Sequence, residues 1–138
     1  MIKPINIGSE KQLFIDSKYI YKSDGIELVM NSPVKSEMVL QSEYPWENYR
    51  VTFNSIINTG ERYLLYYNAL YVDEAGRFYS NMCVAESFDS IRWTRPELGL
   101  FEFQGSKKNN IIGPFLGGAP HYDPFSPFGE PFIMLGTI

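Results

Sequence analysis

The seven residues that begin at Tyr44 combine side chains that could hold a polar ligand. Trp46 and Tyr49 offer aromatic faces, Glu47 offers a carboxylate and Arg50 offers a guanidinium. Aromatic stacking combined with bidentate donors is one way in which proteins hold sugars and carboxylates. The structural alternative is a packed loop with a surface ion pair between Arg50 and Glu47, and the residue types alone leave both open.

A second candidate lies at residues 121–124, in a stretch rich in proline and glycine. The residue before a proline is held extended, so Asp123 could present its carboxylate to a cleft. An ordinary Asp-Pro turn is the alternative. His121 is the only histidine of the chain, which excludes a metal site built from several histidines and leaves His121 as a possible ligand contact. We expect no metal and no cofactor.

Composition removes several classes of function. The net charge is −4 and no basic cluster stands out, which argues against a nucleic-acid partner. The longest apolar runs are only a few residues long, which argues against a membrane span. Cys83 is the only cysteine, so no internal disulfide can form, and its apolar surroundings suggest an inert buried thiol.

The opening residues, Met1 to Glu10, lack the charged-then-apolar pattern of a secretion signal. We therefore expect a cytoplasmic protein, or a secreted one if the native N-terminus has been removed.

Alternating apolar residues and short turns predict an all-β fold. Aromatic residues make up 16% of the chain, and strands favour aromatic and β-branched side chains. No window shows a sustained helical stripe, whereas short alternating runs recur. Turn residues at 58–61, 73–76 and 87–90 separate four expected antiparallel strands, at 51–56, 62–70, 77–85 and 91–94.

Four antiparallel strands in about 45 residues match the repeat unit of a β-propeller blade, although a barrel meander would give the same pattern. We divide 1–138, taken as a single segment, into N-terminal strands within 12–42, a first blade at 50–103, and a connector with the start of a second blade at 104–138. The N-terminal strands are expected at 12–15, 26–30 and 36–41, and the last strand at 131–138.

The segment from Ser87 to Trp93 predicts a strand-to-strand corner. Ser and Asp side chains can accept hydrogen bonds from backbone amides in a tight turn. We expect Asp89 to accept such bonds, with Trp93 buried beneath it, in a structural role.

Five short motifs together resemble bacterial glycosidase-like proteins related to the five-bladed β-propeller hydrolases of the invertase, levanase and arabinanase group. The resemblance covers about residues 12–112 and is most specific between Trp93 and Ile111. The motifs are Leu13 to Asp16, Pro45 to Glu47, Ser87 to Trp93, Pro96 to Leu100, and Gly105 to Ile111.

The resemblance implies hydrolysis of glycosidic bonds by carboxylates at the inner ends of the blades, an acid and a base or nucleophile. Members carry Asn-Asp-Pro where the first blade begins, and here Glu47 is the nearest carboxylate. Members also carry Arg-Asp-Pro in the second blade, and here Asp123 follows Tyr122 instead of Arg. Glu47 and Asp123 are therefore the catalytic candidates, with Asp123 expected to bind sugar hydroxyls. The general acid comes from a third blade.

Five blades need roughly twice this length or more. We therefore expect a propeller segment that is inactive as an isolated chain, with carbohydrate as its partner. Self-association or further C-terminal blades would cover its open sheet edges. The alternatives are a non-catalytic carbohydrate-binding module that uses Trp46, Tyr49 and Arg50, and a purely structural β-domain.

Overall fold

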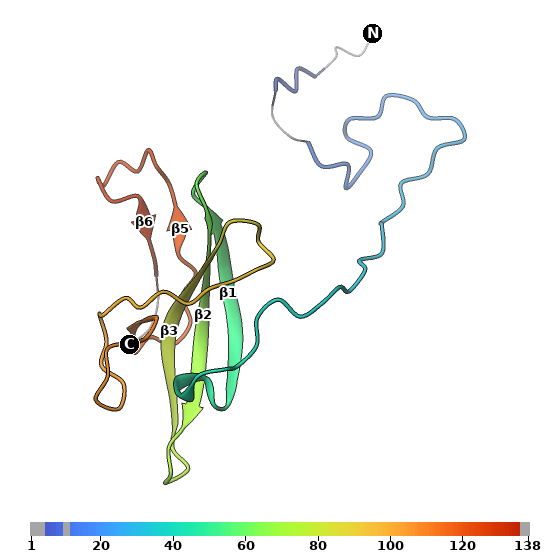
Figure 1. The fold of residues 1–138 in the computed structure, drawn as a ribbon. Helices are drawn as coiled ribbons and strands as arrows, with labels where there is room; N and C mark the ends of the chain where they lie inside the picture. The colour runs from blue at the N-terminus through green and yellow to red at the C-terminus, as the bar shows by residue number, and fades with distance from the viewer. Residues whose placement is uncertain (1–4, 10–11, 136–138) are drawn as a thin grey trace. The chain divides into compact units, whose positions relative to one another are not determined.

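The computed structural model describes residues 5–9 and 12–135 (Figure 1). It divides into two compact units, Met1–Ser36 and Glu37–Ile138. Within the described part of the first unit there is no helix and no strand. Strands also do not form at the three expected positions between residues 12 and 42. A strand needs a hydrogen-bonded neighbour, and apolar side chains of this segment, such as Ile15 and Met30, remain exposed.

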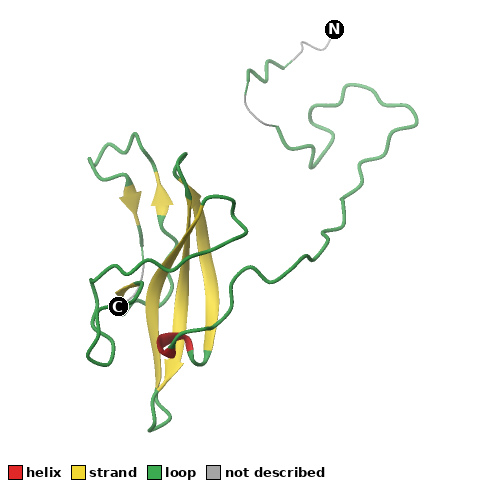
Figure 2. Cartoon of the chain, viewed as in Figure 1, coloured by secondary structure: helices red, strands yellow, loops and turns green. Residues whose placement is uncertain are grey.

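The second unit is built on one four-stranded antiparallel sheet (Figure 2). Its strands lie in sequence order and are β1 (Arg50–Asn58), β2 (Tyr63–Val72), β3 (Phe78–Ser87) and β4 (Ile111–Gly113). The described residues contain one helical turn, the 3-10 helix η1 (Pro45–Glu47). The all-β prediction and the first three expected strands are confirmed. β1 begins one residue earlier than expected, β2 and β3 begin one residue later, and all three strands end two residues later.

The fourth strand lies elsewhere than the sequence predicts. Of residues 91–94, only Thr94 pairs with β3, through an isolated bridge to Glu86. The backbone N–H groups of Ile91 and Arg92 instead donate to Asp89 Oδ1, at 2.9 and 2.7 Å, so this stretch is held as a turn. Residues 95–110 form a long loop, the excursion before β4. The strand β4 then pairs with β3 at Met82 and Cys83.

A β-bulge interrupts the expected alternation of β1. Phe53 pairs with Tyr67 but Ser55 pairs with Tyr66, so Asn54 is the extra residue. Such a bulge shifts the following side chains to the opposite face. In a regular strand Phe53 and Ser55 would share a face, and the bulge breaks that pattern.

Each face of the sheet is covered by a different segment of the second unit. On one face, β2 and β3 contribute small and aromatic core residues, which pack with side chains from η1 and from the excursion before β4. On the other, Asn68 Nδ2 donates to the Phe115 carbonyl at 2.8 Å and Ser55 Oγ donates to the Pro120 carbonyl at 3.3 Å. A two-stranded ribbon of β5 (His121–Tyr122) and β6 (Phe132–Ile133) follows. The core cluster consists of Leu40, Trp46, Leu65, Tyr67, Ala69, Cys83, Ala85, Phe103 and Ile111.

The corner after β3 has the hydrogen bonds that its sequence predicts. Besides the two backbone amides, Ser87 Oγ donates to Asp89 Oδ1 at 3.1 Å and the Arg92 guanidinium donates to Oδ2 at 2.8 Å. The backbone N–H groups of Arg92 and Ile91 lower the pKa of Asp89 to about 2. Trp93 is half-buried and packs against the core, less deeply than expected.

Asp89→Ala is expected to lower the melting temperature at neutral pH, because two backbone amides lose their acceptor. The folded-state pKa lies below the ordinary value, so this stabilisation is present above about pH 4 and disappears as the pH falls towards 2. Thermal melts of the parent and of Asp89→Ala between pH 7 and pH 2 should therefore converge at the acidic end. Glu74→Ala, in the exposed β2–β3 turn, is the control, and its melting temperature should equal that of the parent at every pH tested.

Candidate functional site

Glu47, the first catalytic candidate, lies wholly inside the second unit with 0% of its surface exposed. Its Oε1 accepts hydrogen bonds from the Tyr67 hydroxyl at 2.7 Å and from Arg95 Nε at 2.9 Å. Its Oε2 accepts from the Glu43 backbone N–H at 2.9 Å and from the Arg95 guanidinium at 3.1 Å. Both carboxylate oxygens are therefore engaged within the protein.

Arg95 is the cation that neutralises Glu47, in place of the Arg50 pairing considered from the sequence. Its side chain is only 6% exposed and it also contacts Glu43 Oε2 at 3.1 Å. The same guanidinium donates to the Gln41 carbonyl at 2.5 Å and lies over the Tyr44 ring at 5.0 Å. A buried ion pair needs such additional bonds to offset its desolvation. The pair fixes the segment before β1 against the sheet.

A chain of buried polar groups extends the Glu47 pair into the core. Asn110 Nδ2 donates to the Tyr67 hydroxyl at 2.6 Å and to the Val84 carbonyl at 2.8 Å. Trp46 Nε1 donates to Asn110 Oδ1 at 3.0 Å. Burial, followed by the neighbouring Cys83 and Glu47, raises the pKa of Tyr67, so its hydroxyl keeps the proton that it donates to Glu47.

The sequence predicted an inert thiol at Cys83 and a sugar contact at Trp46, and both residues lie beside this network. Burial raises the pKa of the Cys83 thiol, so it stays protonated and unreactive, as expected. Trp46 is 7% exposed and stacks on the Tyr44 ring with centroids 4.7 Å apart. Its edge-on neighbour is Phe103 at 5.9 Å. These contacts favour a packing role for Trp46, and sugar binding by its ring stays a prediction.

Tyr49 and Arg50 are exposed where β1 begins. The Arg50 guanidinium lies 5.8 Å from the centre of the Tyr49 ring. The Tyr49 ring meets the Phe78 ring edge-on at 5.0 Å. The Asn48 side chain aligns the strands here, since it accepts from the Val72 N–H at 2.9 Å and donates to the Val72 carbonyl at 3.0 Å. The start of β1 thus lies beside the β2–β3 turn.

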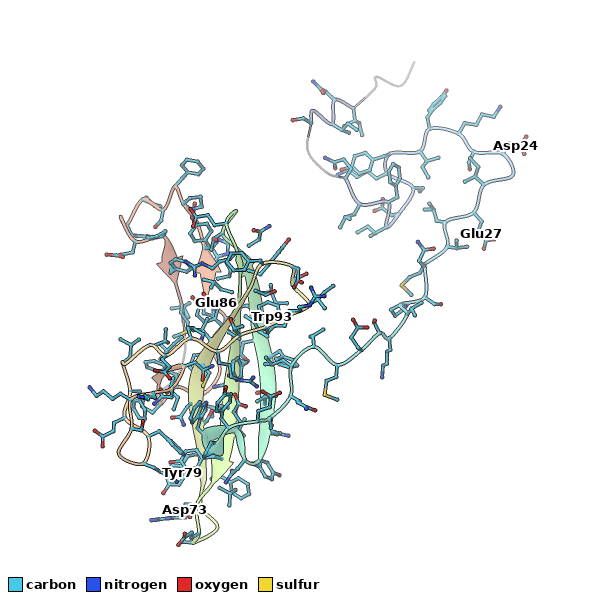
Figure 3. The ribbon with its side chains drawn as sticks, in the orientation of Figure 1. Asp24, Glu27, Asp73, Tyr79, Glu86 and Trp93 are labelled. Carbon is cyan, nitrogen blue, oxygen red and sulfur yellow. The ribbon has the colours of Figure 1, made fainter. Side chains whose placement is uncertain are left out.

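A hollow of about 500 Å³ lies at this end of the sheet, lined by residues of β2, β3 and the later loops. Tyr71 and Tyr79 pair across β2 and β3 and stack with ring centroids 4.9 Å apart and an interplanar angle of 14°. The Tyr79 hydroxyl donates to Asp73 Oδ2 at 3.1 Å, close to the turn (Figure 3). We call this the aromatic hollow; its lining residues are Leu70, Tyr71, Phe78, Tyr79, Ser80, Asn81, Phe101, Pro114 and Leu116.

A second hollow, of about 390 Å³, is bordered by Trp93 and by β1 residues that include Phe53 and Ile56. The Trp93 indole N–H is buried and has no hydrogen-bond partner among the described residues. Trp93 itself is only half-buried. Asn54, Ser55 and Ser90 also line this hollow, so its border combines polar and apolar side chains.

Asp123 and His121 lie on the β5–β6 ribbon, outside the lining of both hollows. Asp123 Oδ1 accepts from the Phe125 N–H at 2.9 Å, which is the Asp-Pro turn geometry named as the alternative. His121 is exposed and pairs with Ile133. No contact between Asp123 and Glu47 is present among the described residues, and catalytic roles for both stay predictions.

The described residues contain no group of three or more His, Cys, Asp or Glu side chains that could hold a metal ion. No helix in that part of the chain is long and apolar enough to cross a membrane.

Comparisons with known proteins find no relative. The chain matches no protein-family model, and it has no significant match among curated proteins or solved structures. Its function is therefore inferred from the geometry described above and from the sequence motifs.

Sequence reasoning missed Arg95, Tyr67 and Asn110 as partners of Glu47 and Trp46. Arg95 is 48 positions from Glu47, and Asn110 is 64 positions from Trp46. No local spacing rule joins residues so far apart. One signal was present: Asn110 directly precedes the apolar Ile111 and Ile112, and a polar residue at the start of a buried strand needs an internal partner.

Proposed function

We propose that this chain is a blade unit of a glycosidase-like β-propeller and that its own residues bind carbohydrate rather than cleave it. The observation that carries the proposal is the aromatic hollow, which lies beside the start of β1 at one end of a four-stranded antiparallel sheet. The resemblance to the five-bladed propeller hydrolases implies a sugar site at the inner ends of the blades. Tyr49, an expected sugar contact, touches Phe78 of the hollow.

The strand order supports the blade interpretation. β1 to β4 lie in sequence order, with short turns between the first three strands, as in a propeller blade. Large apolar side chains such as Phe53 and Ile56 remain more than half exposed on β1. In a propeller, neighbouring blades or a second copy of the chain would cover such residues.

The position of Glu47 supports binding without cleavage. Glycoside hydrolysis needs carboxyl groups that contact the glycosidic bond or the attacking water. Glu47 has no exposed surface, and both its oxygens accept hydrogen bonds from the protein. A substrate could reach this carboxylate only if the Arg95 pair opened.

The purified 138-residue chain is expected to show no glycosidase turnover while retaining affinity for neutral polysaccharides. Hydrolysis of fructosides, arabinosides and xylosides would be followed by release of reducing sugar. Binding would be measured by the retardation of the chain in gels that contain levan, arabinan or xylan. Turnover by the parent chain would overturn the non-catalytic proposal, and its loss in Glu47→Gln under conditions where that variant stays folded would assign the catalysis to Glu47. Absence of both turnover and retardation would favour a purely structural β-domain.

A further inference from the structure

Asn81 of β3 carries a buried donor that the described residues leave unused. The residue is 3% exposed, and its Nδ2 has no hydrogen-bond partner in that part of the chain. It pairs with Ala69 of β2, whose side chain offers no acceptor. A buried amide without a partner costs about 1–3 kcal/mol, so native proteins seldom leave one. Asn81 also lines the aromatic hollow, where a bound molecule could supply the missing acceptor.

The rest of the lining defines the chemistry of that molecule. Four of the nine lining residues are aromatic and none is charged, which favours an uncharged ligand with a ring. Phe78 and Tyr79 are 62% and 39% exposed, so parts of both rings remain accessible. The volume of about 500 Å³ falls within the usual range of small-molecule sites, roughly 300–1,000 Å³.

We propose that the aromatic hollow binds one uncharged sugar residue. Its ring packs against Tyr79, and one of its oxygens accepts a hydrogen bond from Asn81 Nδ2, because residues two apart on β3 share one face of the sheet. A sugar ring offers both features, since its C–H face is apolar and its hydroxyl and ring oxygens are acceptors. This inference rests on the proposed carbohydrate function and adds to it a site and a preference for neutral sugars.

The test measures the affinity of the parent and of three variants for neutral arabino-, fructo- and xylo-oligosaccharides by titration calorimetry. Asn81→Leu keeps a similar volume and removes the donor, and Tyr79→Ala removes an exposed ring. Both are expected to weaken binding of the best oligosaccharide about tenfold or more. Phe88→Ala removes an aromatic ring that is 82% exposed and does not line the hollow, and it should bind as the parent does.

Two further measurements separate a binding role of Asn81 from a structural one. Without sugar, Asn81→Leu should melt no lower than the parent, because an unsatisfied amide has been replaced by an apolar group. A polymer of uronic acids should compete weakly, because the lining holds no cation. Monosaccharides, compared with the oligosaccharides, show whether the site accepts a free sugar or a unit within a chain.

The outcomes distinguish the two proposals. Oligosaccharide binding that Asn81→Leu and Tyr79→Ala leave unchanged would overturn the assignment of this site, while the proposed function would stand. No binding of any neutral sugar by the parent would overturn both. If Asn81→Leu does not fold, Tyr79→Ala decides alone, because its ring lies at the surface.

Discussion

Glu47→Gln is expected to lower the free energy of unfolding by about 3–5 kcal/mol. Glutamine keeps the shape of the side chain but removes the charge that neutralises Arg95, whose side chain is 6% exposed. Glu43 would remain as a partner at 3.1 Å, but its side chain is 53% exposed and its attraction is screened by water. The loss would be measured by denaturant unfolding at neutral pH.

Glu86→Gln is the matched control. It removes a carboxylate from an ion pair with Arg62 at the surface, where both side chains are partly exposed. Exposed pairs of this kind contribute about 0–1 kcal/mol. If Glu47→Gln costs no more than Glu86→Gln, the buried pair does not hold the segment before β1, and Glu47 is again available for a catalytic role.

Trp46→Ala is expected to cost about 3–5 kcal/mol, the usual range for truncating a large core aromatic. The substitution removes the stack on Tyr44, the edge contact with Phe103 and the hydrogen bond to Asn110. Trp46→Phe, which keeps most of the apolar contact and loses the indole N–H, should cost less. Chemical denaturation of both variants checks the order.

If Trp46 were instead an exposed sugar-binding residue, its truncation would change the free energy of unfolding very little. Phe88→Ala shows the cost of truncating an exposed aromatic, which is expected to stay within about 0.5 kcal/mol. Should Trp46→Ala match that small effect while abolishing sugar binding, Trp46 would be a binding residue rather than a core residue.

The parts of the fold that the sequence predicts are those set by local chemistry. The strands at 50–87 follow from alternating side chains and from turn residues such as Asp73 and Gly76. The corner at Asp89 is equally local, because its bonds reach only two or three residues along the chain. Such features depend on residues that are close together in the sequence.

The features that the sequence did not predict depend on distant partners. The fourth strand comes from Ile111–Gly113 because Asp89 holds Ile91 and Arg92 in a turn. The bulge at Asn54 adds one residue to β1, and period-two alternation gives no sign of it.

The candidate site shows the same division. The sequence singled out Trp46, Glu47 and Tyr49 as candidate site residues, but it could not show which of these side chains would be buried. Glu47 and Trp46 turn inward to Arg95 and Asn110, whereas Tyr49 stays at the surface beside Phe78. The aromatic hollow combines β2, β3 and later loop residues, and no single stretch of sequence contains it.

The proposed sugar binding at this end of the sheet is tested most directly by nuclear magnetic resonance on the isotopically labelled chain, titrated with the best neutral oligosaccharide. We predict that the largest chemical-shift changes fall on the backbone amides of residues 78–81, on Tyr71 and on the side-chain amide of Asn81. Largest changes at His121 and Asp123, or no changes at saturating sugar, would contradict it.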